Sequence, residues 1–130
     1  MTPGRIYDPA RPGMVLDIIE PKGLLRKARG LIGSKGLGPG NGMLLRGKQV
    51  HAIGMLFTID AIYLGPDGKV LHIKTLTPGS IGPLIWPGRW ILELDAGEAA
   101  RLGIEPGHML IKEQLDEVQP PSAGPIAPSG

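Results

Sequence analysis

The sequence predicts a small protein of the mainly β class, bordering on α+β. Its short strands are expected to form a closed or half-open β-barrel or sandwich, accompanied by two helices. The chain of 130 residues is long enough for one domain, and 42% of its residues are hydrophobic, so it can bury a core. Its 21 glycines and 14 prolines favour many turns over long helices. Apolar runs of strand length recur between these turns, and closure of the sheet would protect the edges of such strands.

Proline sets both ends of the chain apart from this core. Residues 1–13 contain three prolines, and residues 119–130 contain four prolines among small residues. Segments of this composition have little apolar surface to bury. We therefore expect a flexible N-terminal segment over 1–13, a single β-rich domain over 14–118 and a disordered Pro/Ser/Gly tail over 119–130.

The domain is predicted to begin with a strand and a helix. Met14–Ile19 is a short apolar run that includes β-branched residues, as in strands. A three-turn helix is predicted near 22–32, because apolar residues recur there with helical spacing on one face. Gly33 is suited to end this helix. The five glycines among residues 33–42 predict a loop.

Strand patterns and turn signals alternate in the middle of the chain. Four strands are predicted, over Met43–Arg46, Val50–Leu64, Lys69–Leu76 and Arg89–Leu94. The second of these is long for one strand, so we expect a bulge or bend within it. The turn Pro66-Asp67-Gly68 joins the second and third strands into a hairpin, and three prolines make residues 77–88 irregular.

A short helix near 96–102 and a last strand complete the predicted fold. Asp95 and Glu98 have the spacing of a capping box at the start of this helix, and Gly103 is placed to end it. The last strand is predicted over His108–Lys112.

Positive charge is concentrated in the first half of the chain. Residues 22–48 contain seven Lys or Arg and no Asp or Glu. Such a segment is either the solvated face of a helix or an anion-binding surface, for example for the phosphates of a nucleic acid. The candidate anion-binding residues are Arg26, Lys27, Lys35, Arg46 and Lys48.

Several kinds of chemistry are excluded or unsupported. The chain has no cysteine, which excludes thiol catalysis, disulfides and cysteine-ligated metal centres. Residues Gly42–Gln49 approach the phosphate-binding loop pattern, but Gln49 stands where that loop needs a hydroxyl. We assign no catalytic residue and no metal ligand. No stretch has the length of a transmembrane segment or the character of a signal peptide, so we expect no membrane insertion and a cytoplasmic protein.

Asp60 is the most unusual polar residue, because it lies in an otherwise apolar or neutral run over Ile53–Leu64. An ionised carboxylate in such a place is costly unless it is paired or hydrogen-bonded. It either accepts backbone N–H groups or pairs with an arginine, or it is a functional carboxylate. His51 and Asp60 would lie on opposite faces of an unbroken strand.

Seven stretches form a recognisable order along residues 28–108. They are Ala28–Gly33, Gly42–Leu45, His51–Met55, Phe57–Leu64, Asp67–Val70, Leu92–Gly97 and Leu102–His108. In this order they resemble the prokaryotic family called domain of unknown function 192. The resemblance implies a compact, barrel-like β domain and supplies no catalytic residue and no cofactor. Two positions depart from the family pattern: Leu56 stands where Arg or Lys is common, and His108 stands where Asp is usual.

We therefore expect a small β-barrel binding or accessory module that acts through a small polar ligand or a protein partner. Family-characteristic polar residues are predicted to line one concave face or rim and bind the ligand: Arg29, His51, Asp60 and Glu93. One alternative is a nucleic-acid-associated protein that uses the basic segment 22–48. A second alternative is a metal- or acid/base-dependent enzyme centred on His51, Asp60 and Glu93.

Overall fold

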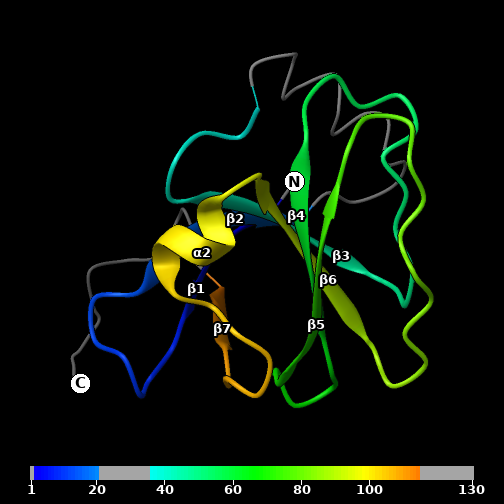
Figure 1. Ribbon diagram of the computed structural model, residues 1–130. Helices are drawn as coiled ribbons and strands as arrows, with labels where there is room; N and C mark the ends of the chain where they lie inside the picture. Colours follow the sequence, from blue (N-terminus) through cyan, green and yellow to red (C-terminus); the bar gives the residue numbers. More distant parts are fainter. Residues whose placement is uncertain (1, 21–35, 115–130) are drawn as a thin grey trace.

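The computed structural model describes residues 2–20 and 36–114 and shows one seven-stranded sheet curled into a half-barrel (Figure 1). The strand order in the sheet is β5-β4-β6-β3-β2-β1-β7. The strands are β1 (Thr2–Tyr7), β2 (Val15–Glu20), β3 (Asn41–Arg46), β4 (Ile59–Leu64), β5 (Val70–Leu76), β6 (Trp90–Asp95) and β7 (Ile111–Gln114). One short helix, α2 (Glu98–Leu102), follows β6. The predicted mainly β, barrel-like fold is confirmed.

The two edge strands of the sheet approach each other and nearly close the barrel. All strand pairs are antiparallel except β2–β3, which is parallel. The chain just before β7 meets the start of β5 through a bridge between Lys69 and Met109. The Leu110 N–H donates to the Gly68 carbonyl at 2.9 Å, and the Val70 N–H donates to the His108 carbonyl at 2.8 Å. These bonds satisfy backbone groups that an open edge would leave unpaired.

Two apolar clusters pack against the two faces of the sheet. The first fills the inside of the barrel and receives side chains from six of the strands and from α2, among them Ile6, Leu16, Leu44, Ile62, Leu92 and Ala99. The second lies on the other face and contains Val50, Ala52, Met55, Ile59, Ala61, Tyr63, Leu76 and Ile91. Strand β4 contributes to both clusters by alternation, and all six of its residues are buried. It is therefore a central strand covered on both faces.

The N-terminal segment differs from the expectation of a flexible stretch over 1–13. Residues Thr2–Tyr7 form strand β1, which pairs with β2 on one side and β7 on the other. Ile6 is 1% exposed and belongs to the first cluster, so this strand has an apolar anchor. Pro3 is tolerated because the pairing with β7 begins only at Gly4, so Pro3 faces a single partner strand.

The predicted long strand Val50–Leu64 is also wrong over its first part. Strand β4 begins at Ile59, and the preceding residues form an irregular segment with one isolated bridge between His51 and Ile81. Val50, Ala52 and Met55 are nevertheless buried, because this segment packs onto the second cluster. Part of this apolar run is therefore buried without forming a strand.

The other predicted elements are found with shifts at their ends. Strands β2, β3, β5 and β6 fall within one or two residues of their predicted bounds, while β7 begins three residues later than predicted. The helix predicted near 22–32 and the tail predicted over 119–130 lie outside the described residues. Within 2–20 and 36–114, no helix is both long and apolar enough to cross a bilayer.

Candidate binding site

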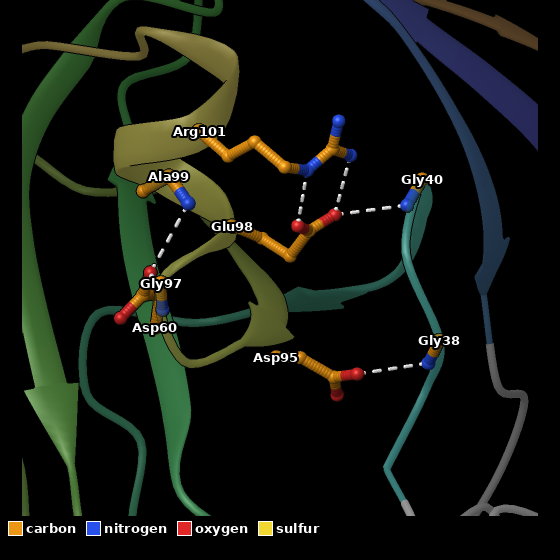
Figure 2. A network of polar contacts seen from close by, with 8 residues as sticks. All are labelled: Gly38, Gly40, Asp60, Asp95, Gly97, Glu98, Ala99 and Arg101. Atoms are coloured by element: carbon orange, nitrogen blue, oxygen red, sulfur yellow. Dashed lines mark hydrogen bonds and ion pairs between the residues drawn. The ribbon is translucent and has the colours of Figure 1, made fainter.

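Asp60 caps helix α2 from a neighbouring strand. Asp60 is 4% exposed, and its carboxylate points at the start of the helix (Figure 2). One oxygen, Oδ2, accepts the N–H groups of Gly97 at 3.0 Å and Ala99 at 3.1 Å, and Oδ1 accepts the Thr75 hydroxyl at 2.8 Å. Three donors thus compensate for burial of the carboxylate, and two of them are N–H groups that the first turn of a helix leaves without partners.

The predicted capping box of Asp95 and Glu98 does not form. The N-cap residue is Gly97, with no capping side chain of its own. Asp95 ends β6, and its carboxylate accepts the N–H groups of Leu37 at 2.7 Å and Gly38 at 2.9 Å. The capping carboxylate comes from Asp60, which is 37 residues away in sequence from Gly97.

Glu98 also holds the chain at residues 36–40 instead of capping its own helix. Its Oε1 accepts the Gly40 N–H at 2.9 Å, and its two oxygens accept the Nε and Nη2 donors of Arg101 at 2.5 and 2.8 Å (Figure 2). The hydrogen-bonded Arg101 guanidinium lowers the pKa of Glu98 from 4.5 to about 2, against the opposing effect of burial. Asp95 and Glu98 together fasten this loop to the β6–α2 connection.

Asp60 and Glu93 do not converge on one site. Asp60 is opposite Leu94 in the β4–β6 pairing, and Ala61 is opposite Glu93. Since side chains alternate across a sheet, Asp60 lies on the barrel side with Leu94, and Glu93 lies on the opposite side. Glu93 is 2% exposed. An acid/base centre cannot be built from these two carboxylates on one face of the sheet.

Of the other predicted ligand-binding residues, His51 is described and does not take part in the hydrogen bonds of the Asp60 carboxylate. His51 is exposed on the segment that precedes β4, where its Nδ1 accepts the Ile53 N–H at 3.2 Å. Arg29 lies outside the described residues. In the described part of the chain, no three His, Asp or Glu side chains are grouped so that they could hold a metal ion.

Two of the five predicted anion-binding residues are described, and both are engaged. The guanidinium carbon of Arg46 lies 4.9 Å from the centroid of the Trp90 ring. The Lys48 ammonium donates to the Trp86 and Gly88 carbonyls at 2.6 and 2.9 Å. Arg26, Lys27 and Lys35 lie outside the described residues.

A pocket of about 260 Å³ opens at one end of the barrel, where the β4–β5 turn meets the start of β7. Its lining residues are Ile6, Leu44, Leu64, Pro66, Asp67, Gly68, Trp90, Leu110, Ile111 and Lys112. Most of them are apolar, and four belong to the first core cluster. Asp67 and Lys112 are the two charged residues in the lining. The mouth of a β-barrel is a common position for a small-molecule site.

Trp90 is the distinctive wall of this pocket. It is the first residue of β6, it is half-buried, and it pairs with Arg46 of β3 and Leu64 of β4. The Lys112 ammonium lies 5.7 Å from the centroid of its ring, on a side chain that also pairs with Glu20 at 2.7 Å. Two cations therefore lie against one indole, in the range of cation–π contacts.

This pocket could not be located from the sequence, and Arg46, the one predicted residue that contacts it through Trp90, is not part of its lining. Its lining comes from the strands β1, β3, β4, β6 and β7, from the β4–β5 turn and from Leu110 just before β7, so no local spacing marks it. Arg46 and Trp90 are cross-strand neighbours, and this relation can be recognised only once the register of β3 and β6 is known.

Comparison with known proteins supports the fold and leaves the activity open. The family model DUF192, described as "Uncharacterized ACR", matches residues 22–111. A putative transcription regulator from Sinorhizobium meliloti 1021 has a TM-score of 0.66 and 22% sequence identity, over 85% of this chain and 92% of that chain. A protein of unknown function from Novosphingobium aromaticivorans DSM 12444 has a TM-score of 0.65 and 24% identity, over 84% of this chain and 83% of that chain. The search of curated proteins finds no match.

Proposed function

The chain belongs to the DUF192 family, and we propose that it is a small binding module that takes an organic anion with an apolar body at the mouth of its half-barrel. The observation that carries this proposal is the pocket at Trp90, an apolar cavity with Arg46 and Lys112 against the same indole ring. The sequence predicted a small polar ligand, and this proposal specifies an organic anion. Of the predicted anion-binding residues, the proposal uses only Arg46.

The chemistry of the pocket favours a ligand with two parts. An apolar body would cover Leu44, Leu64 and the Trp90 ring, and burial of apolar surface supplies about 25 cal/mol per Å². An acidic group at the rim would lie near Arg46 and Lys112, where charge-assisted hydrogen bonds are about twice as strong as neutral ones. The volume of about 260 Å³ suits a compact ligand.

Thermal unfolding of the full chain against matched ligand pairs tests this function. Hexanoate and phenylacetate would each be compared with the corresponding amide. Nucleotides and oligonucleotides would be tested under the same conditions. A ligand present at about a hundred times its Kd adds about 2.7 kcal/mol to the free energy of unfolding. We expect the acids to raise Tm by several degrees and the amides to raise it much less.

Two variants and one control connect any shift to the pocket. Trp90→Ala removes the wall, and Arg46→Gln removes only a cation, so each should abolish most of the acid-dependent shift. Trp86→Ala changes the other tryptophan of the chain, which is 72% exposed and not part of the lining, and should leave the shift intact. Equal shifts from acid and amide, or a shift that persists in both pocket variants, would contradict the proposal.

Binding of nucleic acid is the less favoured function. Lys48, one of the two described members of the predicted anion-binding set, donates its ammonium to backbone carbonyls. An oligonucleotide complex held by phosphate contacts would weaken steeply with added salt. An oligonucleotide-induced shift with that salt dependence, and no shift from the acids, would reverse the preference.

A further inference from the structure

We propose that the loop pair, residues 47–58 between β3 and β4 together with residues 77–89 between β5 and β6, is a docking surface for a partner protein, which presents an acidic segment with large apolar side chains. This surface is separate from the pocket at Trp90. The two loops run side by side along one flank of the molecule (Figure 1), and a bridge between His51 and Ile81 joins them.

Large apolar side chains are unusually exposed on the loop pair. Within 2–20 and 36–114, eight such side chains are prominently exposed, and five of them lie here: Ile53 (50%), Leu56 (70%), Ile81 (64%), Leu84 (46%) and Trp86 (72%). Isolated exposed apolar residues need no explanation, but a gathering of them marks a surface that another molecule covers. Tryptophan and arginine are the residue types that most often dominate the binding energy of protein interfaces.

The loop pair is held in a defined conformation, so this exposure is built into the fold. The Ala52 N–H donates to the Ser80 carbonyl at 2.7 Å, and the Gly82 N–H donates to the Val50 carbonyl at 2.9 Å. The buried Tyr63 hydroxyl donates to the Pro83 carbonyl at 2.8 Å and ties the second loop to the sheet. Beneath lies the second core cluster. A surface fixed in this way loses little conformational entropy when a partner binds.

The charges of the loop pair select an acidic partner. Neither loop contains Asp or Glu, whereas Lys48 and the exposed Arg89 lie within them. Complementary charge favours a partner with carboxylates around its apolar side chains. A second copy of this chain would bring the same cations together, which disfavours self-association through this surface.

The same charges favour a protein partner over an anionic bilayer. Polybasic membrane-binding segments typically carry about four to eight cations. The loop pair has fewer, and the Lys48 ammonium already donates to the Trp86 and Gly88 carbonyls.

The proposal can be tested by using the full chain to select binders from a library of short synthetic peptides. The peptides are built from Asp, Glu, Leu, Ile, Phe and Trp. A parallel library replaces the acids by Lys and Arg. We expect binders only from the acidic library, and Trp86→Ser or Arg89→Glu should each weaken them by about tenfold or more. Both altered side chains are exposed, so these variants should fold normally.

Matched controls repeat the same chemical changes elsewhere on the surface. Val15→Ser removes an apolar side chain that is 46% exposed on β2, and Lys69→Glu reverses an exposed charge beside the β4–β5 turn. Both should leave peptide affinity unchanged. Trp86→Ser should also leave the binding of hexanoate or phenylacetate at the pocket unchanged, which separates the two proposals.

Several results would overturn this assignment. The acidic library could yield no binder, the basic library could yield as many binders as the acidic one, or the peptide affinity could survive Trp86→Ser. Alternatively, the protein could bind only to phosphatidylcholine vesicles that contain about a quarter phosphatidylglycerol. It could also form a concentration-dependent dimer that Trp86→Ser abolishes. The first three remove the acidic protein segment as occupant, and the last two replace it with a bilayer or a second copy.

Discussion

Asp60 shows how a single buried side chain can connect distant parts of this fold. Its carboxylate joins β4 to β5 through Thr75 and to the start of α2 through Gly97 and Ala99. The sequence singled out this residue and correctly included, among its readings, a carboxylate that accepts backbone N–H groups. It could not identify the donors, because they lie 37 and 39 residues away and local spacing pointed to Asp95 instead.

Removal of the Asp60 carboxylate should destabilise the protein. Asp60→Ala leaves the Gly97 and Ala99 N–H groups and the Thr75 hydroxyl without their acceptor, and we expect a loss of about 1–3 kcal/mol in the free energy of unfolding. Urea unfolding measures this loss. Asp67→Ala, at an exposed position in the β4–β5 turn, is the control and should cost clearly less. If both variants unfold at the same urea concentration, the capping role of Asp60 is wrong.

Glu98 should give the protein an acid-sensitive stability. Its pKa is about 2 in the folded chain against an ordinary value of 4.5, because Arg101 hydrogen-bonds to the carboxylate. Between these values the unfolded chain binds more protons, so the free energy of unfolding rises with pH. The contribution is complete above pH 4.5 and is lost as the pH falls toward 2.

Urea unfolding of the wild type and of Glu98→Gln, from about pH 2 to about pH 6, checks this dependence. The variant should show a shallower rise in stability with pH. It should not be flat, because the Arg11 guanidinium also lowers the pKa of Asp8 through a hydrogen bond. Parallel pH profiles for the two proteins would exclude a contribution from the Glu98–Arg101 pair.

At the scale of elements, the contact between the β4–β5 turn and the chain just before β7 links the two edges of the half-barrel. Gly68 has φ +90°, and an added Cβ would lie 2.2 Å from the Leu110 carbonyl oxygen. Gly107 has a similar φ of +97°, but an added Cβ would meet nothing within 4 Å. Substitution of either glycine therefore strains the backbone to a similar degree, but only a side chain at position 68 would also clash with the Leu110 carbonyl.

Alanine at these two glycines should separate strain from closure. Gly107→Ala should cost about 1–2 kcal/mol for the left-handed conformation alone. Gly68→Ala should cost about 1–3 kcal/mol more, because the closing backbone must move. Amide hydrogen exchange adds a local measurement: the Leu110 N–H, which donates to Gly68, should lose protection only in Gly68→Ala. Equal costs and equal protection would show that this contact does not hold the barrel closed.

Elements with strong local patterns were predictable, and those that depend on partners were not. The hairpin of β4 and β5 follows from the turn signal Pro66-Asp67-Gly68 between two runs of strand-forming residues. Strand β1 was missed because Pro3 and Gly4 favour an irregular segment, and the strand is supported by pairing with β2 and β7. Residues 50–58 resemble a strand because many of them are apolar, but their backbone is irregular and buries Val50, Ala52 and Met55 while it leaves Ile53 and Leu56 exposed.

At the scale of the whole molecule, the half-barrel separates two surfaces. The pocket at Trp90 opens into the inside of the curled sheet, next to the first core cluster. The loop pair covers the second cluster on the other face. The sequence predicted a barrel-like binding module but could not place either surface, since both arise from residues that strand pairing and loop packing bring together.

NMR of the two tryptophan indoles is the most direct measurement of the proposed function. The chain has only Trp86 and Trp90, so two indole N–H signals report on the loop pair and the pocket separately. During titration with hexanoate or phenylacetate, the Trp90 signal should shift in a saturable way while the Trp86 signal stays in place, and Arg46→Gln should weaken the effect. If the Trp90 signal does not move, or if both signals move equally with acid and amide, the pocket is not an anion-binding site.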